Sequence, residues 1–155
     1  MKKKIGLLLL SVILIGASKY VYDVNLNYNF KEISENKVYK SGVIPPEKIA
    51  DYVEDHQLKS VIDLRFPHTL DKVNNPEIPQ ELTDEKEAVE KLEGVTYFNL
   101  GTDQVPTQET VDKFLEIMDD SSNYPVLIHC YHGVGRAQMF SALYRIEYEG
   151  WTNQE

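Results

Sequence analysis

Residues 125–146 constrain the possible folds of this chain more than any other segment. The apolar run at residues 126–128 follows a proline and predicts a short buried strand. The strand ends at His129 and Cys130, and five residues then separate Cys130 from Arg136. Beyond Arg136, apolar side chains recur at the spacing of a wide helix face: Met139, Phe140, Leu143 and Ile146. The segment is therefore predicted to be a strand, a tight loop and the N-terminus of a helix.

This order of elements predicts a site for an anion. The N–H groups of the loop point inward and the helix dipole adds positive potential, while Gly133 and Gly135 let a ligand approach the backbone. Arg136 offers a planar fork that suits two phosphate oxygens. The same potential favours the thiolate form of Cys130, a nucleophile suited to attack on phosphorus. A cysteine at the end of a strand can also be purely structural, but the strand–loop–helix context favours the catalytic interpretation.

The spacing His129-Cys130-x-x-Gly133-x-Gly135-Arg136 resembles the signature loop of the cysteine-dependent protein tyrosine and dual-specificity phosphatases. Two earlier segments, residues 38–42 and 60–65, resemble the opening of the small atypical dual-specificity members from plants, fungi and bacteria. The resemblance covers about residues 29–151. It implies a protein-tyrosine-phosphatase-like α/β fold and hydrolysis of phosphate monoesters through a phosphocysteine intermediate, without a cofactor or a metal.

The resemblance also implies a role for each residue of the site. Cys130 is the nucleophile, Arg136 holds the phosphoryl oxygens, and Asp103 protonates the leaving oxygen from a loop that ends in a proline. His129 orients the loop and helps to keep Cys130 ionised. The phosphate-binding residues are those of the loop itself: Tyr131, His132, Gly133, Val134, Gly135 and Arg136.

Two positions leave alternatives open. Asp103 could instead be a loop residue that bonds its own backbone, and Asp63 is a second candidate acid, although its place beside Arg65 favours a structural ion pair. Ala137 stands where the family usually has Ser or Thr, an alanine shared by the phosphatases of regenerating liver. We expect the missing hydroxyl to slow the breakdown of the phosphocysteine.

Strands and helices alternate along the chain, which predicts a central, mostly parallel sheet flanked by helices. Helices are expected from Pro45-Pro46, from a capping box at Asp84-x-x-Glu87 to Gly94, and after Thr107. Strands are expected at residues 60–65 and 95–100, with a short strand pair around Ser41-Gly42 and a loop at residues 66–79. Ligands of such sheets bind beyond the carboxyl ends of the strands. Three segments reach that edge: residues 65–68, 101–106 and 130–136.

The N-terminus predicts export. Three lysines and an apolar run at residues 5–17 are typical of a secretory signal, and residues 16–18 are small enough for cleavage. The run is shorter than the roughly 20 residues of a membrane span, yet further apolar residues at 21–24 keep an uncleaved anchor open. Either alternative places the domain in an exported, periplasmic or other extracytoplasmic location, tethered to the membrane if the segment is uncleaved.

We divide the chain into a signal or anchor at residues 1–22, a linker at residues 23–35 and the catalytic domain at residues 36–155. Residues 152–155 form a second capping box, the start signal of a helix. The resembling family packs one more helix at this point, so the domain is expected to lack its last helix.

Composition limits the partners. A net charge of −9 argues against nucleic acid, and a single cysteine excludes an internal disulfide. The expected partner is a phosphorylated protein or a small phosphate ester. Phosphotyrosine is favoured over inositol (poly)phosphates, which some relatives hydrolyse, because the variable loop positions Tyr131, His132 and Val134 carry only one titratable side chain.

Three other functions stay open. The chain could be a pseudophosphatase that binds phosphate without turnover, or a membrane-tethered interaction module. It could also be a rhodanese-type sulfurtransferase, although the loop between Cys and Arg is one residue shorter in that class.

Overall fold

The computed structural model describes residues 2–67, 80–152 and 154 of the chain. A five-stranded sheet with the order β1-β2-β5-β3-β4 forms its centre. Three pairs, β2 with β5, β5 with β3, and β3 with β4, are parallel, and β1 runs antiparallel to β2 at the edge. The strands are β1 (Lys31–Ser34), β2 (Val38–Ser41), β3 (Ser60–Asp63), β4 (Thr96–Asn99) and β5 (Val126–His129). The mostly parallel sheet that the alternation predicted is confirmed.

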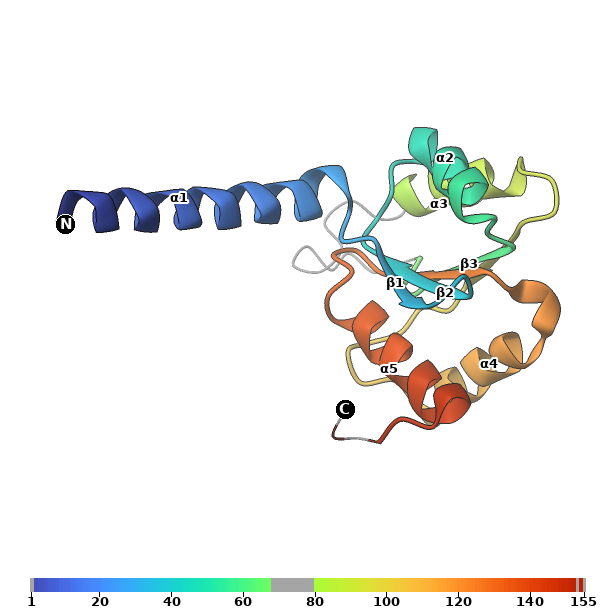
Figure 1. Ribbon diagram of the computed structural model, residues 1–155. Helices are drawn as coiled ribbons and strands as arrows, with labels where there is room; N and C mark the ends of the chain where they lie inside the picture. Colours follow the sequence, from blue (N-terminus) through green and yellow to red (C-terminus); the bar gives the residue numbers. More distant parts are fainter. Residues whose placement is uncertain (1, 68–79, 153, 155) are drawn as a thin grey trace.

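Helices cover both faces of this sheet (Figure 1). Helices α2 and α3 lie on one face, α4 and α5 lie on the other, and α1 projects away from the domain. The α-helices are α1 (Lys2–Val21), α2 (Pro46–His56), α3 (Gln80–Glu90), α4 (Gln108–Asp119) and α5 (Arg136–Glu149). A π-helical turn, η1 (Tyr22–Leu26), continues α1, and a 3₁₀ turn, η2 (Ser121–Asn123), leads into β5. This is the helix-flanked α/β fold expected from the sequence.

The central strand β5 explains why its sequence is a continuous apolar run. It is covered on both faces, so all of its residues are buried, and successive side chains point to opposite sides. Val126 and Ile128 join the core with α4 and α5, whereas Leu127 joins the core with α2 and α3. The alternation continues past the apolar run, so that His129 faces α3 and Cys130 faces α5.

Helix signals near the site agree with the structure. Thr107 caps α4, because its side-chain oxygen accepts a hydrogen bond from the backbone N–H of Thr110 at 3.2 Å. Helix α2 begins at Pro46, as expected, and its Ile49 is 1% exposed in the core between this helix and the sheet.

Two local predictions are wrong. Helix α3 begins at Gln80, so Asp84 is not its cap; the Asp84 carboxylate instead accepts a hydrogen bond from Gln80 one turn earlier, at 2.7 Å. The segment predicted as a linker contains β1, and the turn of the β1–β2 hairpin lies at residues 35–37 rather than at Ser41-Gly42. A four-residue polar edge strand has too little apolar pattern to be recognised from sequence.

Some predictions fall outside the described residues. They are the loop at residues 68–79, which includes His68, and residues 153 and 155 of the second capping box.

Candidate active site

Three loops meet at the carboxyl edge of the sheet, and Arg136 connects them. Its guanidinium Nη1 donates to the backbone carbonyl of Leu64, after β3, at 2.8 Å and to that of Thr102, after β4, at 3.2 Å. Arg136 is itself the first residue of α5, after the loop from β5. The predicted convergence of three segments is therefore confirmed for the part of each that the structure describes.

The loop from Cys130 to Arg136 is closely packed against its neighbours. Cys130 is 3% exposed and lies in the same cluster as Ala137 and Phe140 of α5. Gly133 has φ +71°, and a β-carbon there would lie 2.4 Å from the backbone nitrogen of Gly42. A side chain is therefore excluded both by conformation and by space. This explains why the motif needs glycine at this position.

Asp103 is an exposed residue of the segment that connects β4 to α4. The next residue, Gln104, packs so closely that a β-carbon on Gly135 would be 2.6 Å from its side-chain oxygen. The preceding residue, Thr102, is the one whose carbonyl binds Arg136. Both chain neighbours of Asp103 thus lie against the signature loop or Arg136, so the backbone at Asp103 passes beside the site. Its role as the acid stays a prediction.

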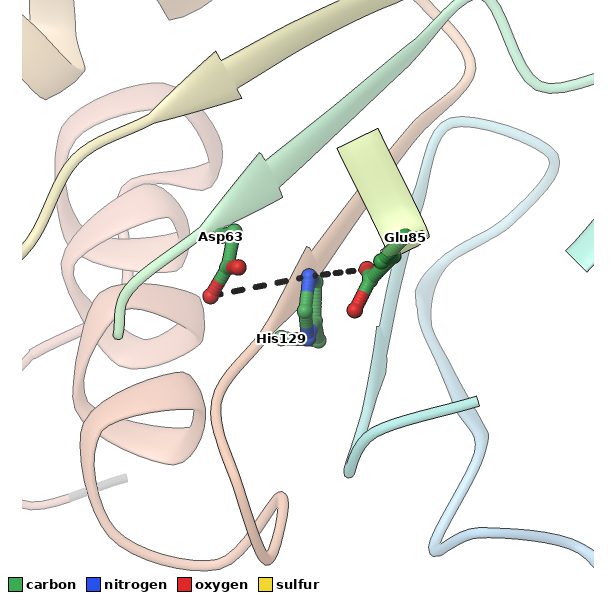
Figure 2. A group of neighbouring side chains, drawn as sticks. All are labelled: Asp63, Glu85 and His129. Carbon is green, nitrogen blue, oxygen red and sulfur yellow. Dashed lines mark ion pairs between the residues drawn. The ribbon is translucent and has the colours of Figure 1, made fainter. Parts of the chain in front are cut away.

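His129 belongs to a buried ionic cluster on the opposite face of the sheet (Figure 2). Its Nε2 lies 2.8 Å from a carboxylate oxygen of Glu85 in α3 and 3.8 Å from one of Asp63 at the end of β3. The Arg65 guanidinium contacts the other oxygens of these carboxylates, at 2.8 Å for Asp63 and 2.5 Å for Glu85. The ion pair predicted between Asp63 and Arg65 is present, so Asp63 has a structural role.

Charge interactions decide the protonation of this cluster. Burial alone would lower the pKa of His129, but the carboxylates of Glu85 and Asp63 outweigh it and raise that pKa. Burial alone would raise the pKa of Asp63, but His129 and Arg65 outweigh it and lower that pKa. The two carboxylates therefore favour the imidazolium form of His129, one residue before Cys130.

The structure brings ligand atoms of Asp63, Glu85 and His129 within 4.8 Å of one another, a grouping that no residue spacing in the sequence indicates. The donor set does not fit a metal well. The Arg65 guanidinium already bonds both carboxylates, and a metal would need the neutral imidazole rather than the favoured imidazolium. We therefore interpret the three residues as part of an ion-pair network.

Lys40 was missed by sequence reasoning. This residue of β2 is 4% exposed, and its ammonium donates to the carbonyl of Gly133 at 2.6 Å. Burial and nearby Lys31 lower the pKa of Lys40, while the neighbouring Cys130 acts on it in the opposite direction. A lysine inside a buried strand directly before Ser41-Gly42 was the available signal, because an ammonium is rarely buried without a partner.

Glu85 was also missed. It is one of several acidic residues of α3, and it differs from the others in being 1% exposed. Only the packing of α3 against the sheet selects it, so no local sequence signal could have found it.

The comparisons with known proteins agree with this geometry. A family profile described as "DSP-PTPase phosphatase fused to NAD+ Kinase" matches residues 14–154. The dual specificity protein phosphatase TpbA of Pseudomonas aeruginosa is 36% identical over 52 residues, which are 34% of this chain and 24% of that protein. The matched part is thus about a quarter of that relative's length.

Solved structures show the same fold. That of P. aeruginosa TpbA has a TM-score of 0.60 at 23% identity, over 84% of this chain and 70% of that one. The core catalytic domain of the PP-IP phosphatase Siw14 from S. cerevisiae, in complex with citrate, has a TM-score of 0.58 at 26% identity, over 80% and 68%. A TpbA variant with serine in place of a cysteine, in complex with phosphotyrosine, has a TM-score of 0.57 at 23% identity, over 83% and 68%. Together with the profile match over most of the chain, the fold and the loop geometry place this protein in the DSP-PTPase family of dual-specificity, protein-tyrosine-phosphatase-like phosphatases.

Proposed function

We propose that this protein hydrolyses phosphate monoesters with Cys130 as the nucleophile. The observation that carries the proposal is the placement of Cys130 and Arg136 at the two ends of one glycine-bearing loop at the carboxyl edge of the sheet. Loop N–H groups, the N-terminus of α5 and Arg136 would all favour a phosphoryl group there. The carbonyls of Leu64 and Thr102 accept hydrogen bonds from Arg136 Nη1 and so fix its guanidinium beside the loop.

The proposed reaction has two steps. The Cys130 thiolate attacks phosphorus, the ester P–O bond breaks, and Asp103 gives its proton to the leaving oxygen. Water then attacks the phosphocysteine and passes a proton to the Asp103 carboxylate; the P–S bond breaks, which releases phosphate and restores the thiolate. Arg136 and the loop N–H groups hold the equatorial oxygens in both steps.

Phosphotyrosine is the first substrate class that the comparisons support, because the TpbA variant of similar fold is in complex with phosphotyrosine. Inositol pyrophosphates are the second, supported by the likeness to the PP-IP phosphatase Siw14. The variable loop positions Tyr131, His132 and Val134 carry no lysine or arginine, which fits the less highly charged substrate better.

The N-terminal segment is proposed to export the domain and to remain as its membrane anchor. An 18-residue window, Leu9–Leu26, is long and apolar enough to cross a membrane, and none of it is buried against the rest of the protein. Fusing the first 30 residues to a reporter that is active only outside the cytoplasm tests export. Sedimentation of the mature chain with membranes tests whether the anchor is retained.

Cys130→Ser tests the chemistry. The variant should lose hydrolysis of p-nitrophenyl phosphate but still bind vanadate, because the loop remains while a hydroxyl is a far weaker nucleophile than a thiolate. Residual activity within about tenfold of the wild type, roughly 1.4 kcal/mol in the barrier, would exclude covalent catalysis through Cys130.

A further inference from the structure

The N-terminal helix is joined to the catalytic loop by a very short connection. Only Asn27 and Tyr28 separate Leu26, the last residue of η1, from Asn29. The Asn29 side-chain amide donates to the carbonyl of His132 in the signature loop at 2.9 Å. The carbonyl of Tyr28 accepts from the backbone N–H of Gly42 at 2.6 Å. Three residues of chain reach at most about 10 Å, so the end of the helix is held close to the phosphate site.

This connection is also compact rather than slack. The backbone N–H of Asn29 donates to the carbonyl of Asp23 at 2.7 Å, and that of Phe30 donates to the carbonyl of Asn27 at 2.8 Å. Tyr28 and Asn29 both adopt left-handed backbone angles, φ +50° and +53°. Non-glycine residues keep such angles only when the surroundings impose them. The helix therefore leaves the domain in a defined direction.

Helix α1 leaves the domain on the side where the carboxyl edge of the sheet lies. Figure 1 shows α1 leaving the domain from the side where the loop between β5 and α5 lies, and extending away from the sheet. The window Leu9–Leu26 has 18 residues and would measure about 27 Å as a helix, close to the roughly 30 Å hydrocarbon core of a bilayer. With α1 in a bilayer, the carboxyl edge of the sheet faces the surface of that bilayer.

Three exposed apolar side chains lie on the segments around the site. Val105, on the loop that carries Asp103, is 83% exposed, and Val134, in the signature loop, is 63% exposed. Leu26, at the end of η1, is 61% exposed. Two loops and the helix end thus present apolar side chains around a site built for an anion, a combination that suits the boundary between headgroups and acyl chains.

We propose that the substrate is a membrane lipid with a phosphomonoester headgroup, taken from the bilayer that holds α1. This inference rests on the phosphatase function and the retained anchor proposed above. The headgroup layer on each side of a bilayer is about 5–7 Å thick, which matches the short connection from Leu26 to the signature loop. A lipid phosphate would enter the loop while its glycerol and acyl chains meet Val105 and Val134. Hydrolysis would release inorganic phosphate and leave the lipid alcohol in the membrane.

The experiment uses the full chain reconstituted into phosphatidylcholine vesicles. Three substrates are compared: phosphatidic acid in the same vesicles, a phosphotyrosine peptide tethered to those vesicles, and soluble p-nitrophenyl phosphate. Wild type is compared with Val105→Asp, which places a charge at one of these exposed apolar positions, and with Val105→Leu as the matched apolar control. We expect Val105→Asp to lower phosphate release from phosphatidic acid by about tenfold or more. The charged side chain would keep the site away from the bilayer surface, which lowers the effective concentration of the lipid headgroup at the site. Val105→Leu should stay close to wild type. Because the new carboxylate of Val105→Asp lies two residues from Asp103, the rate on phosphatidic acid is divided by the same protein's rate on p-nitrophenyl phosphate, and the tenfold loss is expected in that ratio.

The outcomes separate this inference from the proposed function. If p-nitrophenyl phosphate is not hydrolysed by the wild type, the phosphatase function itself fails. Hydrolysis of that ester without hydrolysis of phosphatidic acid would overturn the lipid substrate alone. Faster turnover of the tethered phosphotyrosine peptide than of phosphatidic acid would replace the lipid with a membrane-associated phosphoprotein. A protein that does not remain with the vesicles would refute the membrane-facing arrangement.

Discussion

Substituting Glu85 with Gln tests whether the buried ionic cluster around His129 stabilises the folded protein. The change keeps the size of the side chain but removes the charge that faces His129 at 2.8 Å and Arg65 at 2.5 Å. Removing one partner of a buried ion pair costs about 3–5 kcal/mol, because a charge is left without compensation. The glutamine oxygen can still accept one hydrogen bond, so we expect a loss of about 3 kcal/mol in the free energy of unfolding. For a chain of this size that corresponds to roughly 6–12 °C in Tm.

The loss should depend on pH, and its sign follows from the direction of the pKa shift. Folding raises the pKa of His129 above its ordinary value of 6.5, chiefly through Glu85 once burial is overcome. The resulting stabilisation is fully present below pH 6.5 and is lost as pH rises through the folded-state pKa. The glutamine variant lacks most of this contribution. Its deficit against wild type should therefore be largest in mildly acid solution and smaller in alkaline solution, where only the lost contact with Arg65 remains.

Urea denaturation of the full chain in detergent, at about pH 6 and about pH 9, measures the loss in the free energy of unfolding and its dependence on pH. Glu87→Gln is the matched control, because it removes the same charge from an exposed position of the same helix. An equal deficit for Glu85→Gln at both pH values would refute the charged state assigned to His129. A deficit no larger than that of the control would show that the cluster does not stabilise the fold.

Three further predictions concern the site itself. Asp103→Asn should lower turnover of alkyl phosphates by roughly a hundredfold. Turnover of p-nitrophenyl phosphate should fall much less, because its leaving group needs less protonation; equal losses in steady-state assays would show that Asp103 is not the acid. Lys40→Met removes a buried donor to the loop, so iodoacetamide should alkylate Cys130 about tenfold more slowly at neutral pH, whereas exposed Lys31→Met should not change the rate. Ala137→Ser should raise kcat by about tenfold with little change in kcat/KM, since one hydrogen bond to a developing anion contributes about 1.5–3 kcal/mol. Rapid-quench measurements that find neither a burst in the wild type nor a gain in the serine variant would contradict this.

The arrangement of β5, the signature loop and α5 could be predicted because its signals are contiguous in the chain. The three signals all lie within residues 125–146. They are a continuous apolar run, glycines at fixed offsets from the cysteine, and apolar side chains at helical spacing. Thr107 as the cap of α4 was predictable for the same reason, since the cap bonds a residue three positions later. The family resemblance rests on this contiguous segment together with residues 38–42 and 60–65, and it is confirmed by the profile match. The roles of Cys130, Arg136 and Asp103 follow from it as predictions.

The surroundings of the loop were decided only by the tertiary structure. Glu85 meets His129 because β3 lies beside β5 and α3 packs on that face, although the two residues are far apart in the chain. Lys40 reaches Gly133 because β2 pairs with β5 on its other side, and the sequence contains no local sign of that pairing. A short strand such as β1 carries almost no periodic signal, and it forms because β2 offers it a partner. Local patterns therefore determined which residues form the anion loop. The order of the strands determined which buried charges pack against that loop. A buried charge needs an oppositely charged or hydrogen-bonding partner, and only the sheet brings that partner within a few ångströms.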